Sequence, residues 1–180
     1  LFPKKCVNCR KPGSYLCSQC FSFLSYDPER ICLHCNLASW NGLTHPNCIK
    51  KQGIDGSFSA LSYNGVMKRL LFTYKYRPYV SDLQHILSEL FYEGIIQNEF
   101  FMYAFSKDAL LVPIPLHKEK LRKRGYNHAA LLAQTLGKQL EVEVLDGIER
   151  TQKTKSQFLL KKEEREENMK DVFQVKEKVK

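Results

Sequence analysis

Seven cysteines and one histidine in the N-terminal quarter of the chain form four pairs with one common spacing. Two residues separate the members of each pair, so both side chains of a pair lie on a single tight turn. Two thiolates in this geometry can direct their sulfurs at one zinc ion ~2.3 Å away, and two such turns complete a tetrahedral site. The pairs therefore predict zinc, one or two ions, held by Cys6, Cys9, Cys17, Cys20, Cys32, Cys35, His45 and Cys48.

The predicted zinc is structural, because eight protein ligands for two ions leave no open coordination position for catalysis. Pairing each turn with its neighbour closes the shortest loops and costs the least chain entropy. An interleaved arrangement, first pair with third and second with fourth, remains open. His34 lies inside the third pair and is expected to face solvent. This segment has little apolar content, so metal should supply on the order of 10 kcal/mol of folding free energy per site.

Disulfides and a redox dithiol are the alternative uses of these cysteines. The odd count of seven disfavours a disulfide framework. The opening residues lack the charged start and long apolar stretch of a secretory signal, which favours a reducing, cytoplasmic location. A single redox dithiol would not need three companion pairs. Metal binding is therefore the preferred interpretation.

A second group of candidate residues combines an apolar run with a dense set of cations. The run at 109–114 leads into Pro113-Ile114-Pro115 and is followed by Arg122, Arg124, Gly125 and Asn127. Ligands of α/β folds bind at the carboxyl ends of strands, and arginines offer planar forks to phosphate oxygens. Gly125 would allow close backbone approach, and a helix beginning after Asn127 would direct its N-terminal dipole at the same place. An anion site is predicted; a solvated basic loop is the alternative.

Charge and length bound the class of protein. The chain has 180 residues, 28 Lys and Arg against 19 Asp and Glu, and a net charge of +9. This balance suits a partner that bears phosphates, either a nucleic acid or a small polyphosphate metabolite. No apolar run approaches the ~18–20 residues that a membrane span needs. A second basic stretch includes Lys153, Lys155 and Arg165, and surface solubility is its alternative explanation.

Hydrophobic periodicity places these residues on a series of strands and helices. Strand, helix and strand in this order predict a parallel α/β sheet. The tail from Thr151 has little apolar periodicity and is expected to be mobile, and no internal repeat is evident. The expected elements are a strand at 57–63, a helix carrying Met67, Leu70, Leu71 and Tyr74, a helix at 81–97, a strand at 109–114 buried on both faces, a basic loop at 121–127, a helix at 129–140 with Asn127 as N-cap, and a strand at 142–145.

A domain boundary is expected near residue 53. Every cysteine lies between residues 6 and 48, and a polar, glycine-containing stretch follows at 50–56. The prediction is a small zinc-binding domain at 1–53 and an α/β domain at 54–180.

The order of these motifs resembles that of the ComF family. The cysteine pairs are followed by L-V-P-I-P-L at 111–116, R-G-Y-N at 124–127, K-T-K-S-Q at 153–157 and R-E-E-N at 165–168. Members of that family resemble type I phosphoribosyltransferases fused to an N-terminal double zinc ribbon, and are associated with DNA uptake in competent bacteria. The resemblance covers nearly the whole chain.

The resemblance implies binding of phosphoribosyl pyrophosphate together with Mg²⁺. The loop at Pro113–Pro115 then corresponds to the pyrophosphate-side loop of the family. The implied ligand-binding residues are Arg122, Arg124, Gly125, Asn127, Lys153, Lys155, Gln157 and Arg165. Fixed cations suit this chemistry, because a pyrophosphate leaving group needs charge stabilisation.

One feature of the transferase signature is missing from the sequence. An acidic pair followed by T-T-G should come after a segment like that at 172–179, but the chain stops at Lys180 and contains no such motif. The expected fold is therefore α/β, with a zinc ribbon followed by an incomplete phosphoribosyltransferase-like parallel sheet. Glycosyltransferase activity is not expected of the chain as it stands.

Two further functions remain open at this point. One is a zinc-containing module that binds single-stranded DNA through Lys50, Lys51, Tyr15, Phe21 and Trp40. The other is a module that docks on partner proteins, such as DNA-uptake proteins, without transferase activity. Fold resemblance does not choose between them.

Overall fold

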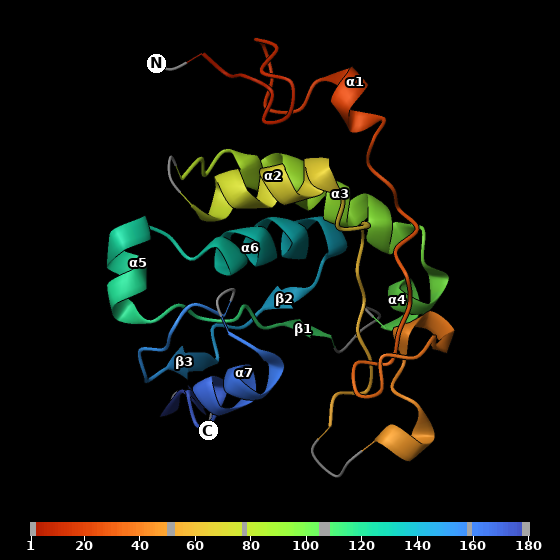
Figure 1. Cartoon of the computed structure of the whole chain (residues 1–180), viewed down its shortest axis with the longest axis vertical. Coiled ribbons are helices and arrows are strands. Elements are labelled where there is room, and N and C mark those ends of the chain that lie inside the picture. Colours follow the sequence, from red (N-terminus) through yellow and green to blue (C-terminus); the bar gives the residue numbers. More distant parts are fainter. Residues whose placement is uncertain (1–2, 50–52, 77–78, 105–108, 158–159, 178–180) are drawn as a thin grey trace. The chain divides into compact units, whose positions relative to one another are not determined.

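The computed structural model describes residues 3–49, 53–76, 79–104, 109–157 and 160–177. The chain folds as two compact units, Leu1–Lys107 and Asp108–Lys180 (Figure 1). No helix in the described ranges is both long and apolar enough to cross a membrane.

The first unit begins with the cysteine-rich segment, which has little regular structure. A one-turn helix, α1 (Ser18–Phe21), and two 3-10 turns, Trp40–Gly42 and Pro46–Cys48, are joined by irregular backbone. Isolated antiparallel bridges join Lys5 to Pro12 and Ile31 to Ala38. These short elements cannot enclose an apolar core, so another interaction must hold the segment in one shape.

Three helices follow in the same unit: α2 (Gly65–Lys75), α3 (Leu83–Ile96) and α4 (Glu99–Ala104). The side chain of Asn64 caps α2 by accepting a hydrogen bond from the backbone N–H of Met67 at 2.9 Å. Helices α2 and α3 lie side by side (Figure 1), and their apolar faces form the core of this unit. Its buried side chains include Ala60, Leu61, Val66, Met67, Leu70, Tyr74, Leu83, Leu87, Leu90 and Ile95.

The expected strand at 57–63 is wrong. Apart from a single bridge between Gly56 and Leu43, this stretch is extended without a ladder partner. Its apolar residues Ala60 and Leu61 are buried, and a Cβ at Gly94 of α3 would lie 2.6 Å from the Cβ of Ala60. Burial against a helix, and not pairing in a sheet, explains the apolar pattern.

The cysteine-rich segment and the stretch before α2 are joined by hydrogen bonds. The backbone N–H of Ser62 donates to the carbonyl of Ser25 at 2.9 Å, and the Asn64 amide donates to the carbonyl of Phe23 at 2.5 Å. Both parts thus belong to one compact unit, whose limit lies at residue 107. The domain boundary expected near residue 53 stays a prediction.

The second unit is a small α/β structure. Strands β1 (Leu110–Leu111) and β2 (Glu143–Val144) pair in parallel, and α6 (His128–Leu140) packs on them (Figure 1). The close approach needs Gly137, because a Cβ there would lie 2.6 Å from a methyl group of Val144. The α/β class, the parallel sheet and the Asn127 N-cap of α6 are confirmed.

Two expectations for this part of the second unit are wrong. The stretch at 121–127 is mostly helical, because α5 covers Lys118–Arg124. Strand β1 is short and is not buried on both faces, since Leu110 is 51% exposed and Ile114 is 56% exposed. In the described part of the chain β1 has a single neighbouring strand, β2, so its apolar side chains are only partly covered.

The described residues of the tail from Thr151 include regular structure, where a mobile segment was expected. Strand β3 (Ile148–Arg150) pairs antiparallel with β4 (Phe173–Val175), and α7 (Lys162–Met169) lies between them in the chain. A hydrogen bond from the backbone N–H of Thr151 to the carbonyl of Val172, at 2.9 Å, continues the pairing. Most described residues of this tail are exposed, and many of them are charged. Its few apolar residues therefore do not recur with a helical or strand period.

Candidate functional site

The structure groups the eight predicted metal ligands into two clusters in sequential order. Within each cluster the ligand atoms all lie within 4.8 Å of one another. The interleaved arrangement is not formed, and His34 is exposed outside both groups, as expected. The clusters are Cys6, Cys9, Cys17 and Cys20, and Cys32, Cys35, His45 and Cys48.

The distances inside the clusters fit tetrahedral zinc. Ligand sulfurs ~2.3 Å from a tetrahedral ion are about 3.8 Å apart. The sulfurs of Cys9 and Cys17 are 3.6 Å apart, and the Cys35 sulfur lies 3.3 Å from Nδ1 of His45. Both clusters can therefore hold a zinc ion in a structural role, with no protein position left open.

The first cysteine pair of each cluster adopts the same backbone turn. The N–H of Cys6 donates to the carbonyl of Lys11 and that of Cys32 donates to the carbonyl of Leu37, both at 2.9 Å. The residue after each pair is left-handed, with φ of 66° at Arg10 and 59° at Asn36. The segment is thus a structural repeat, which the differing side chains conceal in the sequence.

Side chains outside the clusters orient two of the ligands. Nε2 of His45 lies 3.1 Å from the carbonyl of Ala38; donation to that carbonyl leaves Nδ1 as the lone-pair nitrogen, which faces the cluster. The amide of Asn8 donates to the sulfur of Cys20 at 3.2 Å. This donation stabilises charge on that sulfur.

The thiol pKa values also favour a bound cation. Burial raises the pKa of Cys6, but backbone N–H groups that donate to its sulfur outweigh burial and lower the pKa to about 6. Backbone N–H donation, chiefly from Cys35, likewise lowers the pKa of Cys32 to about 6. Burial and neighbouring thiols raise the pKa of Cys48 to about 11. Ionising every thiol of a cluster near neutral pH therefore requires positive charge at its centre.

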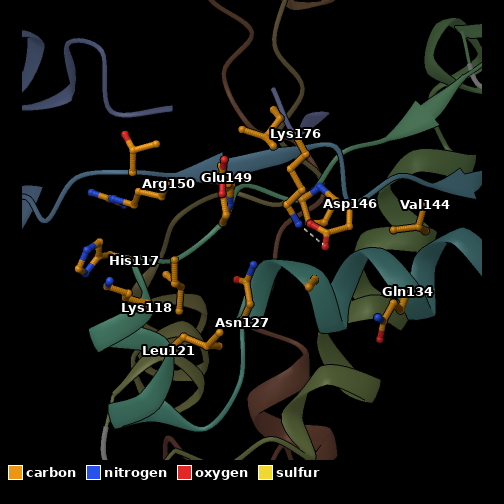
Figure 2. Close-up of a pocket in the computed structure, with 16 residues that line it drawn as sticks. His117, Lys118, Leu121, Asn127, Gln134, Val144, Asp146, Glu149, Arg150 and Lys176 are labelled. Atoms are coloured by element: carbon orange, nitrogen blue, oxygen red, sulfur yellow. Dashed lines mark hydrogen bonds and ion pairs between the residues drawn. The ribbon is translucent and has the colours of Figure 1, made fainter. Parts of the chain in front are cut away.

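A pocket of about 710 Å³ lies in the second unit (Figure 2). Its walls come from the loop after β1, the start of α5, the first half of α6, and strands β2 and β3. The carboxyl ends of the parallel strands open into it, which is where α/β folds place ligands. The lining residues are Pro113, Pro115, Leu116, His117, Lys118, Leu121, Asn127, Ala130, Gln134, Val144, Asp146, Ile148, Glu149, Arg150, Thr151 and Lys176.

Asn127 joins two walls of this pocket. Its side-chain oxygen accepts a hydrogen bond from the backbone N–H of Ala129 at 3.1 Å, which caps α6. Its amide nitrogen donates to the carbonyl of Ile114 at 3.1 Å. The N-terminus of α6 is thereby fixed against the loop after β1, and its positive dipole end faces the pocket.

Arg150 is a cation built into the pocket wall. It donates to the hydroxyl of Thr154, its guanidinium lies 5.5 Å from the ring centre of Phe173, and its Nε is buried without a hydrogen-bond partner. Burial lowers the pKa of Arg150. Figure 2 shows it on the same side of the pocket as His117 and Lys118.

Two ion pairs hold lysines near the pocket. Lys176 contacts Asp146 at 2.5 Å (Figure 2), and Lys153 contacts Glu119 at 2.5 Å. The contact with Lys153 lowers the pKa of Glu119. Asp146 and Lys176 belong to the pocket lining, whereas Glu119 and Lys153 lie outside it.

Of the eight predicted ligand-binding residues, the structure brings Asn127 to the pocket lining. Gly125 ends α5 with φ of 86°, so its role in the structure is the turn. Arg124 is buried, and its Nη1 lies 2.8 Å from Nδ1 of His128. The predicted residues outside the lining are Arg122, Arg124, Gly125, Lys153, Lys155, Gln157 and Arg165.

The predicted residues of the tail are tied to each other. The backbone of Lys155 exchanges hydrogen bonds with the side chain of Asn168, at 3.1 and 3.2 Å. Nε of Arg165 donates to the carbonyls of Gln157 and Leu160. Both polar atoms of the Gln157 amide are buried without a partner, which marks this turn as a place where a polar group is still needed.

Several lining residues were not predicted as ligand residues. Arg150 begins the basic block before K-T-K-S-Q, and His117 and Lys118 follow the first apolar motif, so their neighbours carried a signal. Asp146 and Lys176 carried none, because the pairing of β3 with β4 brings them together from distant positions. Lys50 and Lys51, the cations of the nucleic-acid hypothesis, lie outside the described residues, as does part of the segment at 172–179.

Comparison with known proteins supports the resemblance. The chain is 28% identical to competence protein ComFC of Bacillus subtilis over 137 aligned residues, which are 74% of this chain and 51% of that protein. It is 26% identical to competence protein F of Haemophilus influenzae over 181 aligned positions, which are 96% of this chain and 76% of that protein. The chain thus spans about half the length of the first relative.

No family model matches the chain. No solved structure matches it either. The resemblance to the ComF family is nevertheless confirmed by two curated competence proteins, and the N-terminal cysteine clusters fit the zinc ribbon that it implied.

Proposed function

We propose that this chain is a ComF-like protein whose second unit binds phosphoribosyl pyrophosphate, or a similar phosphate ligand, while structural zinc holds the first unit in shape. The observation that carries the proposal is the pocket itself. It lies at the carboxyl ends of two parallel strands, faces the N-terminus of α6, and is lined by a half-buried arginine, Arg150, that neighbouring side chains hold in place.

Each group has a definite task in this proposal. Arg150 donates to phosphate oxygens from a fixed position, because Thr154 and Phe173 hold its guanidinium. The α6 N-terminus adds a favourable dipole. Lys120 adds a further cation on α5, and its pKa is lowered by burial and by the charges of Arg124 and Arg150. The anion would relieve the repulsion among these three cations.

Mg²⁺ belongs to the proposal as a partner of the ligand's phosphates. It would neutralise charge on the pyrophosphate and orient it, as hard cations do with oxygen ligands. Since the acidic pair and T-T-G loop do not occur in these 180 residues, the proposed function of this chain is binding and not phosphoribosyl transfer.

Thermal unfolding of the zinc-loaded chain tests the proposal. Phosphoribosyl pyrophosphate with Mg²⁺ at about 100 times its dissociation constant should raise Tm by about 5 °C or more, since such binding adds roughly 2.7 kcal/mol. The shift should be smaller without Mg²⁺. Arg150→Met should abolish it, while Lys138→Met, which removes an exposed cation on α6 outside the pocket, should leave it intact.

Two results of this experiment would contradict the proposed function. An unchanged Tm at millimolar ligand, with zinc content confirmed, would exclude the pocket as a phosphoribosyl pyrophosphate site. A shift that survives Arg150→Met would place the ligand elsewhere on the chain.

A role in DNA uptake is proposed from the relatives, which are competence proteins by name.

The second candidate function, binding of single-stranded nucleic acid by the first unit, is favoured by exposed aromatic rings in the cysteine-rich segment. Phe21 is 48% exposed and Trp40 is 71% exposed, and base stacking on such rings is sequence-tolerant. Binding that weakens steeply with salt would support it.

A further inference from the structure

The first unit contains a groove between the first cysteine turn and α2. Its volume is about 590 Å³, and both walls belong to one compact unit. Val7, Asn8 and Arg10 form one wall; Gly65, Lys68, Arg69, Phe72 and Thr73 of α2 form the other. Three of the eight lining residues are cations and none is acidic.

The charge of this region is one-sided well beyond the groove. Residues 3–26 contain Lys4, Lys5, Arg10 and Lys11 and no carboxylate, and residues 56–76 contain Lys68, Arg69 and Lys75 and no carboxylate. The fold joins these two segments at the groove. A surface with an excess of cations attracts a polyanion more strongly than a single monovalent group.

The backbone conformation at Arg10 does not favour an arginine. Its φ of 66° is left-handed, a conformation that glycine and asparagine adopt most readily. The equivalent position of the second cysteine turn is Asn36, with φ of 59°. The first turn thus carries a long cation where the backbone favours a small residue, and this cation lines the groove.

Arg69 is held in place from the metal cluster. It donates to the side-chain oxygen of Asn8, whose amide donates to the sulfur of Cys20 at 3.2 Å. The cysteine turn therefore fixes the position of a cation on α2. The groove is a preformed site and not a chance meeting of flexible side chains.

An exposed aromatic ring lies beside these cations. Phe72 is 58% exposed and packs on Tyr76 of the next helical turn, with ring centres 4.9 Å apart. Its free surface is available for stacking. Proteins that bind single-stranded nucleic acid combine cations, which contact phosphates, with exposed aromatic rings, on which bases stack. An acidic peptide would contact the cations but would not need the ring.

We propose that this groove binds single-stranded nucleic acid, with phosphates on Arg10, Lys68 and Arg69 and a base on Phe72. The proposal deepens the second candidate function, rests on it, and is independent of the pocket in the second unit. It assigns the nucleic-acid contact to residues other than Tyr15, Trp40 or the lysines at 50 and 51.

Fluorescence anisotropy of a labelled ten-residue oligothymidylate with the full zinc-loaded chain tests it. Arg10→Asn keeps the backbone conformation, as Asn36 demonstrates, and Lys68→Gln removes an exposed charge. Each lost phosphate contact lowers affinity about fivefold at ~0.1 M salt and reduces the slope of log K against log salt by about 0.7. The double variant should therefore bind about 25-fold more weakly. Phe72→Ala should cost about fivefold or more.

Two matched controls accompany these variants. Phe23→Ala removes an aromatic ring of the same unit that is 59% exposed but lies outside the groove. Lys138→Gln removes an exposed cation from α6 in the second unit. Both should bind like the unmodified chain.

The possible results distinguish failure of the proposed groove from failure of the second candidate function. If the oligonucleotide does not bind at all, the second candidate function fails and the groove with it. Binding that Arg10→Asn, Lys68→Gln and Phe72→Ala leave unchanged would overturn the groove alone. Equal affinity for an abasic strand or for polyglutamate of the same length would also overturn the proposal, because base stacking would then contribute nothing.

Discussion

Lys176 and Asp146 are two lining residues on which the affinity for the proposed phosphate ligand would depend. Their 2.5 Å ion pair lies in the pocket lining (Figure 2). The Asp146 side chain is 77% exposed and that of Lys176 is 32% exposed, so the carboxylate is well hydrated while the lysine is held inward. An incoming phosphate must compete with this carboxylate for the ammonium group.

Replacing Asp146 with Asn should therefore strengthen anion binding. The variant removes both the competitor and a negative charge at the pocket edge, so we expect pyrophosphate to bind roughly three- to tenfold more tightly at low salt. Isothermal titration with pyrophosphate measures this. Asp171→Asn is the matched control, because Asp171 is exposed and lies outside the pocket. Unchanged or weaker binding by the Asp146 variant would show that Lys176 is not available to the ligand.

The sequence predicted some site residues and concealed others for a physical reason. Asn127 was predictable because its capping role is local: an asparagine precedes an apolar helical pattern. The cysteine ligands were predictable because a spacing of two residues is enough to place both side chains of a pair on one tight turn. Arg150 was not assigned, although it adjoins a quoted motif, since its burial depends on Phe173 from a distant strand.

At the scale of elements, apolar periodicity predicted helices correctly only where one face of the helix is buried. Helices α2, α3 and α6 present such faces and were expected close to their observed bounds. Helix α5 is a short run of charged residues around Leu121, so periodicity gave no signal and a loop was expected. The stretch at 57–63 gave a false strand signal, because its apolar residues are buried against α3.

The packing of α3 on this stretch gives a prediction about Gly94. A Cβ at this position would lie 2.6 to 2.8 Å from side-chain and backbone atoms of Ala60, so Gly94→Ala forces the two segments apart. We expect it to lower the free energy of unfolding by about 1–3 kcal/mol. Denaturant titration of the zinc-loaded chain measures the change.

Gly65→Ala is the control for Gly94→Ala. Gly65 is also in a helix, α2, but a Cβ there would meet no atom within 4 Å. Alanine at this site should be neutral or slightly stabilising, because it restricts the unfolded chain without a clash. Equal effects of the two substitutions would contradict the close packing of Gly94.

At the scale of the whole molecule, the cysteine-rich segment and the helices that follow it in the first unit differ in what is buried inside them. The buried side chains described at 3–49 are chiefly metal ligands, with Cys6 and Cys32 at 0% and Cys20 at 2% exposure. Helices α2 and α3 bring an apolar core of their own. We therefore expect the cysteine-rich segment to depend on metal for its shape and the helices to keep theirs without it.

Metal removal should act selectively. A strong chelator under reducing conditions should release about two zinc ions per chain and abolish hydrogen-exchange protection of the backbone amides of Cys6 and Cys32, which are hydrogen-bonded within the cysteine turns. Amides of α6 should keep their protection, because that helix packs on β2. Zinc supplies on the order of 10 kcal/mol per site in such segments. Full protection of the cysteine turns after verified zinc loss would contradict this division.

The exposed side of β1 has a practical consequence for handling the protein. Within the described ranges this strand has one partner, and Leu110, Val112 and Ile114 in and after it are 51%, 37% and 56% exposed. Unpaired strand edges with apolar side chains are templates for edge-to-edge association between molecules. Concentrated stocks should therefore scatter light and lose monomer on storage, and a charged residue at position 112 is the simplest remedy.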